Sequence, residues 1–77
     1  MTASDLENMT EAELEALILQ GNSNEARFIL GRLLLEGLSD SVVKNEKKGI
    51  NWLKEAIKNG HMGALEYKTY YDIRFDK

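Results

Sequence analysis

The sequence predicts a single all-α domain, and three features of the chain support that class. Apolar residues recur at spacings of three and four positions, as they do on one face of a helix. The 77 residues include no proline, and no segment shows the alternating β-branched residues of a strand. Signals for helix starts and ends divide the chain into four segments, which we expect to be helical over residues 11–20, 25–36, 46–59 and 62–75.

The first helix is marked by a capping box. Thr10 and Glu13 have the required spacing, so the helix should begin near Glu11 and end before Gly21. Its apolar residues at helical spacing predict a buried stripe formed by Leu14, Leu17 and Ile18.

The second helix should start after Asn24, which is placed to cap it. It should end at Gly37, which adopts the left-handed conformation easily. Its apolar residues cover more than one stripe, so we expect the helix to pack on two sides. These residues are Ala26, Phe28, Ile29, Leu30, Leu33, Leu34 and Leu35.

Asn45 is placed to cap the third helix, and Gly60 should end it. The apolar residues of the third helix are a stripe of Ile50, Leu53 and Ile57, with Trp52 and Ala56 beside it. The fourth helix has core spacing at Ala64, Tyr67 and Tyr71. Its other apolar and aromatic residues are Leu65, Tyr70, Ile73 and Phe75.

The chain also repeats itself. Ala26 and Ala64 lie 38 residues apart, and the pattern of residues 14–21 reappears at residues 53–60 with an offset of 39. A helical hairpin of this kind cannot cover its own apolar side, and stacked hairpins form a superhelical solenoid. We therefore expect a four-helix αα-superhelix, with one full repeat and a half repeat at each end.

The residues at the repeat positions resemble the Sel-one-like repeat, a relative of the tetratricopeptide repeat. The resemblance rests on Ala26, Leu30, Gly31, Leu33, Gly37, Val42, Asn45, Lys48, Trp52, Ala56, Gly60, His61 and Ala64. It implies that Ala26 and Gly31 let the second helix approach the third. It also implies that Trp52 and Ala56 pack the third helix on the second, and that Gly60 turns the chain into the next repeat.

Several positions depart from the family pattern. Gly49 replaces the usual alanine, Leu34 replaces a tyrosine, and the loop before Val42 is longer. Lys68 and Thr69 stand where a second leucine-glycine pair is expected, which indicates that the fourth helix caps the domain. Members of the family act as adaptors and regulators of other proteins, so the resemblance implies the same role here, without catalysis.

Composition limits the other possibilities. The chain has no cysteine for a disulfide or a thiolate zinc site, and its net charge is −3. No apolar segment approaches the ~20 residues needed to span a membrane. The N-terminus lacks the basic start and apolar run of a secretory signal, so we expect a cytoplasmic protein.

Catalytic and metal sites have little support in the sequence. His61 is the only histidine and follows Gly60 at a repeat position, where we expect a turn residue. Glu7, Glu11 and Glu15 could share one helical face, but no second histidine joins them. No acid–base partners stand at a recognisable spacing from the serines, which are Ser4, Ser23, Ser39 and Ser41. We therefore expect no catalytic residue, cofactor or metal.

The fourth helix has aromatic side chains on more than one side, whereas the end of a solenoid normally presents a polar face. A protein partner or a second copy of the chain would account for the excess, and so would tyrosines that only close a small core. Tyrosine and arginine are enriched at interface centres. We predict that the partner, another protein or a homodimer mate, contacts Tyr67, Tyr70, Tyr71, Arg74 and Phe75.

The lysine-rich side of the third helix is a second candidate surface. Lys47, Lys54 and Lys58 fall on one side, with Lys44 and Lys48 near the helix start. Such a surface suits an anionic partner such as RNA. The acidic total charge and the lack of aromatics among these lysines argue against nucleic acid, so protein recognition is the preferred function. In a third interpretation, the acidic first helix inhibits a target by occupying its basic site.

Overall fold

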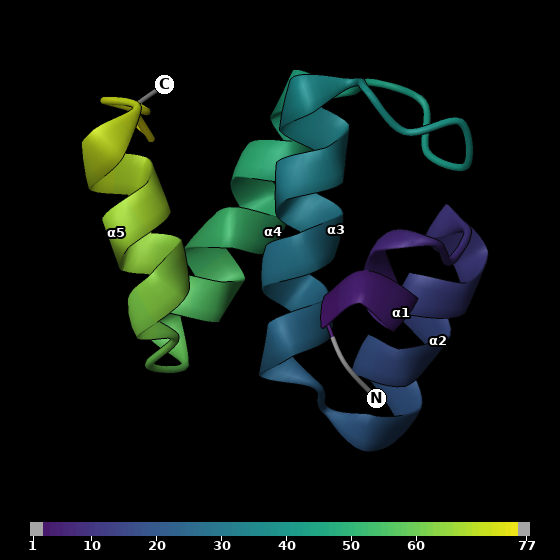
Figure 1. Ribbon diagram of the computed structural model, residues 1–77. Coiled ribbons are helices and arrows are strands. Elements are labelled where there is room, and N and C mark those ends of the chain that lie inside the picture. The colour runs from purple at the N-terminus through teal and green to yellow at the C-terminus, as the bar shows by residue number, and fades with distance from the viewer. Residues whose placement is uncertain (1–2, 76–77) are drawn as a thin grey trace.

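The computed structural model describes residues 3–75, which form five helices. The helices are α1 (Ala3–Glu7), α2 (Glu11–Gly21), α3 (Asn24–Glu36), α4 (Glu46–Lys58) and α5 (Met62–Tyr70). Figure 1 shows α3 at the centre, with α1 and α2 on one side and α4 followed by α5 on the other. The described residues contain no strand, so the prediction of an all-α protein is confirmed.

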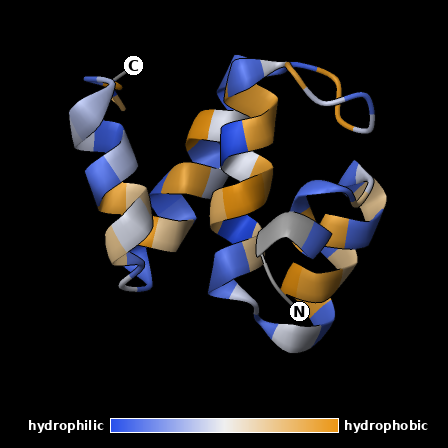
Figure 2. Ribbon diagram, viewed as in Figure 1, coloured by the Kyte–Doolittle hydropathy of each residue, from blue (hydrophilic) through white to orange (hydrophobic). Residues whose placement is uncertain are grey.

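The dimensions are those of a compact domain. The radius of gyration of the Cα atoms is 11.2 Å, and about 11.5 Å is typical of a folded chain of this length. Figure 2 shows apolar residues concentrated on α3, whereas α5 carries fewer of them. The core is therefore built around α3.

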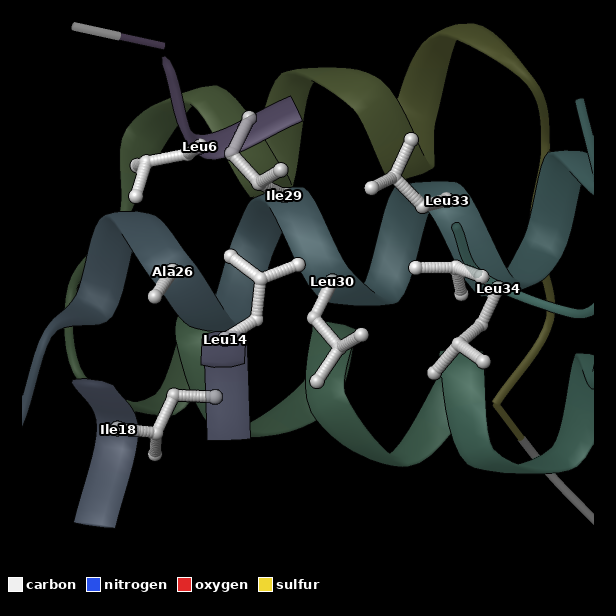
Figure 3. Close-up of a cluster of buried hydrophobic side chains, with 9 residues drawn as sticks. Leu6, Leu14, Ile18, Ala26, Ile29, Leu30, Leu33 and Leu34 are labelled. Atoms are coloured by element: carbon white, nitrogen blue, oxygen red, sulfur yellow. The ribbon is translucent and has the colours of Figure 1, made fainter. Parts of the chain in front are cut away.

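The short helix α1 was not predicted. Five residues are too few to show a helical period, and a helix of that length is not stable alone. It is held by tertiary packing, because Leu6 is only 4% exposed and belongs to the core cluster of α2 and α3. Figure 3 shows Leu6 beside Ile29 of α3.

The capping box of α2 is confirmed. The backbone N–H of Glu13 donates to Thr10 Oγ1 at 3.1 Å, and the backbone N–H of Thr10 donates to Glu13 Oε1 at 2.9 Å. The expected end before Gly21 is wrong by one residue. Gly21 is helical, and Asn22 takes the left-handed conformation with φ 52° instead, which asparagine tolerates better than most residues.

The N-cap of α3 is Ser23 and not Asn24, which corrects the prediction. Ser23 Oγ accepts a hydrogen bond from the backbone N–H of Ala26 at 3.1 Å. Asn24 is the first helical residue, and its side-chain Nδ2 donates to the backbone oxygen of Ala56 at 3.1 Å. Asn24 therefore ties α3 to α4. At the other end Gly37 is left-handed, as predicted.

The main core cluster lies between α3 and the helices before it. Figure 3 shows Leu14 and Ile18 of α2 beside Ala26 and Leu30 of α3. The predicted stripe of α3 is buried throughout: Ala26, Ile29, Leu30, Leu33 and Leu34. The opposite side of α3 contacts α4, with Phe28 and Leu35 packed against the second cluster. Packing of this helix on two sides is thus confirmed.

The backbones of α3 and α4 meet at two glycines. A Cβ added to Gly31 would lie 3.0 Å from the backbone oxygen of Gly49 and 3.0 Å from the backbone nitrogen of Leu53. A Cβ added to Gly49 would lie 2.8 Å from the backbone oxygen of Gly31. Real Cβ atoms do not approach backbone oxygens this closely, so the crossing requires glycine at position 49 and has almost no room at position 31.

The second cluster joins α4 to α5. Its fully buried members are Leu53, Ala56 and Ala64. Partly buried residues surround them: Phe28, Leu35, Ile57, Tyr67, Ile73 and Phe75. Trp52 packs instead against the main cluster. The repeat positions therefore serve as helix-packing residues, and Gly60, with φ 91°, turns the chain between α4 and α5.

The last helix is shorter than predicted, because α5 ends at Tyr70 and not at residue 75. Asp72 takes the left-handed conformation with φ 52°. The backbone N–H of Ile73 then donates to the oxygen of Lys68 at 3.0 Å, and that of Asp72 donates to Thr69 at 3.2 Å. These two bonds form a Schellman motif, which ends the helix and turns residues 73–75 back toward α4. The third helix likewise ends one residue early, at Lys58.

Candidate functional site

The predicted partner surface lies on α5 and the turn that follows it. Tyr70 is 80% exposed and Tyr71 is 59% exposed. Their rings meet edge to face with centroids 4.8 Å apart, and the Tyr71 ring also lies 4.8 Å from the ring of Tyr67. Tyr71 is therefore a surface residue, contrary to its predicted core position. We refer to Tyr70 and Tyr71 as the tyrosine pair.

Tyr67 links the tyrosine pair to the interior. Its ring contacts Phe28 of α3 edge-on at 5.8 Å, and its hydroxyl donates to Glu36 Oε2 at 3.1 Å. Burial raises the pKa of Tyr67 to about 12, and the negative charge of Glu36 adds to the shift. Tyr67 therefore keeps its proton and anchors the tyrosine pair to α3.

Glu36 is held in turn by Arg32. Arg32 Nη1 lies 3.3 Å from Glu36 Oε1, and the same guanidinium pairs with Glu7 of α1. A row of polar contacts thus runs from α1 across α3 to Tyr67 on α5. Only the pair of Arg32 with Glu36 has helical spacing, so the sequence offered no signal for the rest of the row.

Arg74 and Phe75, the other two predicted contact residues, lie on a different part of the surface. Both line a hollow against α4. Phe75 is partly buried, and the Nζ atoms of Lys54 and Lys68 lie 5.9 and 5.0 Å from the centre of its ring. Arg74 is exposed and lies 3.6 Å from Asp72. The five predicted residues are therefore divided between the tyrosine pair, its anchor and this hollow.

His61 has a structural place between α4 and α5. Its Nδ1 accepts a hydrogen bond from the backbone N–H of Ala64 at 2.8 Å, which makes it the N-cap of α5. Its Nε2 lies 2.6 Å from Glu25 Oε1, and its ring lies 4.8 Å from the ring of Phe28. Since Nδ1 accepts, the imidazole proton sits on Nε2 and faces Glu25. The predicted turn role is what this geometry provides.

The lysine-rich side of α4 is only partly available for an external anion. Lys48 pairs with Glu11 and lies 3.9 Å from Glu15, both on α2. The hydrogen bond to Glu11 is the main cause that raises the pKa of Lys48. Lys44 lies 3.7 Å from Glu46. Two of the five predicted lysines are thus already next to carboxylates of the chain.

Comparisons with protein-family models, with curated proteins and with solved structures found no match to this chain. Among residues 3–75, no three histidine or acidic side chains are grouped so as to hold a metal ion. Within the same part of the chain, no helix combines the length and apolarity needed to cross a bilayer. The resemblance to the Sel-one-like repeat therefore stays a prediction.

Proposed function

We propose that this chain is a small protein-recognition module that binds another protein without catalysis and uses the tyrosine pair as its contact surface. The observation that carries the proposal is the exposure of two tyrosine rings that are held against each other and anchored through Tyr67. Rigid, exposed tyrosines are typical centres of interfaces, because they bury a large area with little loss of side-chain freedom.

The surroundings of the pair support the same function. Met62 is 65% exposed and Leu65 is 40% exposed on the same helix. A helix that turns this much apolar and aromatic surface to water has more of it than closing the core requires. The pair is also built on a helix whose N-cap and Schellman turn fix both ends, which favours a preformed contact surface.

We also propose that the architecture is an αα-solenoid of the Sel-one-like type, with α5 as its cap. Each of the helices α2 to α5 contacts its neighbour in the chain, as in stacked hairpins. Position 69, which corresponds to Gly31 in the internal repeat, is threonine. A side chain there would keep a further helix from the close approach seen between α3 and α4, so an adaptor or inhibitor of limited length fits better than a growing array.

The test is site-specific photocrosslinking in the native host. A photoreactive phenylalanine analogue replaces Tyr70 in one variant and Gln20, an exposed residue of α2, in another. We expect one defined protein adduct from position 70 and no adduct of the same mass from position 20. An adduct of twice the mass of the chain would identify the partner as a second copy. No protein adduct from position 70, or equal adducts from both positions, would contradict the proposal.

A further inference from the structure

A hollow between α4 and the C-terminal turn is lined by three cations. It measures about 230 Å³, and its walls are Lys47, Ile50, Asn51, Lys54, Arg74 and Phe75. No carboxylate is among these residues, although the chain as a whole carries a net charge of −3. This hollow, which we call the cationic hollow, therefore has the opposite charge to the molecule around it.

The positive charge of the cationic hollow is poorly compensated within residues 3–75. Arg74 has Asp72 at 3.6 Å, and both side chains are well exposed to water. For Lys47 and Lys54, the described part of the chain provides no ion pair. Lys54 instead stands 5.9 Å from the Phe75 ring centre, with Lys68 on the same ring. An incoming anion would relieve the repulsion among these cations.

The floor of the cationic hollow is apolar. Ile50 and Phe75 are partly buried there, and Asn51 supplies an exposed amide that can donate and accept. A volume of about 230 Å³ exceeds the ~150 Å³ of a protein cavity that holds one benzene. The hollow thus has room for one apolar side chain beneath a ring of cations.

These features distinguish between the two anionic macromolecules that could dock here. Nucleic acid needs an extended basic track and free aromatic faces. The track is interrupted, because Glu15 and Glu55 line the adjoining hollow around Trp52, and the Phe75 ring already carries two lysines. A peptide needs only one apolar anchor with carboxylates beside it, and that is the chemistry the cationic hollow presents.

We infer that the cationic hollow binds an acidic segment of a partner protein, with one apolar side chain of that segment on Ile50 and Phe75 and its carboxylates at Lys47, Lys54 and Arg74. The inference rests on the proposed protein-recognition function and adds a second contact with a stated chemistry. It uses residues other than the tyrosine pair, so the two contacts can be tested separately.

The test measures fluorescence anisotropy of the full chain with a labelled synthetic peptide in which one phenylalanine is flanked by aspartates. We expect saturable binding that weakens as salt is added. Exchange of the phenylalanine for serine, or of the aspartates for asparagines, should each weaken binding at least about fivefold. A dissociation constant unchanged by either exchange overturns the inference, and so does the absence of saturable binding.

Variants locate the contact on the protein. Lys54→Glu should weaken binding of the peptide about tenfold, because it replaces an attraction with a repulsion. Lys58→Glu makes the same charge change on α4 but does not line the hollow, so its dissociation constant should stay within about twofold of the original. Equal losses in the two variants would mean that charge alone is responsible, and would refute the assigned site.

Two further arms separate the alternatives. A single-stranded oligonucleotide of equal charge should not displace the peptide, and displacement with higher affinity would overturn the choice of a protein segment. Tyr70→Ala should leave peptide binding unchanged, and a loss there would contradict a separate second contact. If position 70 yields no crosslink while the peptide still binds, the proposed tyrosine contact fails and the cationic hollow stands.

Discussion

At the crossing of α3 and α4, a single carbon atom decides whether the two backbones can meet. The hypothetical Cβ of residue 49 falls 2.8 Å from a backbone oxygen, which cannot move aside as the end of a flexible side chain can. Gly49 is also the position where the chain departs from the alanine of the Sel-one-like pattern. The departure is therefore explained by the closeness of the two helices in this protein.

Gly49→Ala should destabilise the fold. Alanine favours an isolated helix by about 1 kcal/mol, but forcing atoms into a tight contact costs about 1–3 kcal/mol. We expect a net loss of about 1 kcal/mol or more in the free energy of unfolding, measured in urea. Gly21→Ala is the matched control, because nothing lies within 4 Å of its Cβ and the residue is helical. A stability gain in both variants would show that the crossing is looser than described.

His61 stabilises α5 as an N-cap, and its loss should be measurable. His61→Ala removes the acceptor for the Ala64 N–H and should cost about 1 kcal/mol of folding free energy. His61→Asn keeps a capping acceptor and should recover part of that loss, although it forfeits the ring contact with Phe28. Urea unfolding at neutral pH compares the three proteins. Equal stability of the alanine variant and the original would contradict the cap.

Tyr67 should make the stability sensitive to alkaline pH. Its pKa is raised from 10.0 to about 12, so the folded protein holds this proton more tightly than the unfolded chain does. The stabilisation is complete below pH 10 and is lost as the pH rises through about 12. Compared with Tyr67→Phe, the original protein should lose its advantage in thermal melts between these values. A constant difference across that range would contradict the hydroxyl's role.

Among the helices, the ends show where tertiary structure departs from local sequence signals. The start of α2 was predictable, because Thr10 and Glu13 carry the whole capping box within four residues. The end of α5 was not, because the helical pattern of apolar residues continues to Phe75 and no glycine marks a stop. Asp72 turns left-handed there, and the packing of Ile73 and Phe75 against the second cluster compensates for its strain.

Asp72→Gly should therefore stabilise the protein. Glycine adopts a positive φ without the steric cost that aspartate incurs, and a gain of about 0.5–1 kcal/mol is expected from this relief. Chemical denaturation with a tryptophan-fluorescence readout gives the value. A loss of stability would mean that the turn after α5 is held by the side chain of Asp72 and not by the Schellman bonds.

The stripes of apolar residues on α2, α3 and α4 were predictable for a simple reason, since helical spacing alone identifies them. The partners of these stripes were harder to predict. Phe28 was expected to widen the apolar face of α3, yet nothing in its local sequence indicates that it contacts both His61 and Tyr67. The cationic hollow has the same origin, because α4 and the turn of residues 71–75 meet only through the fold.

At the scale of the whole molecule, the five described helices form a scaffold that presents different chemistry at its two ends. Glutamates gather on α2, and some of them neutralise Lys48 of α4. The opposite end exposes the tyrosine pair and the cationic hollow. The repeat residues between them are buried packing residues, so recognition falls to the side chains that depart from the repeat pattern.

The central claim is recognition of a protein through the tyrosine pair, and the most direct measurement is calorimetric titration of the crosslinked partner with purified variants. The double variant Tyr70→Ala, Tyr71→Ala should bind about 30-fold or more weaker than the original chain, because each truncation of an interface tyrosine costs about 1–2 kcal/mol. Its thermal melt should stay unchanged, since both rings are largely exposed. An unchanged affinity, with the variant folded, would contradict the account.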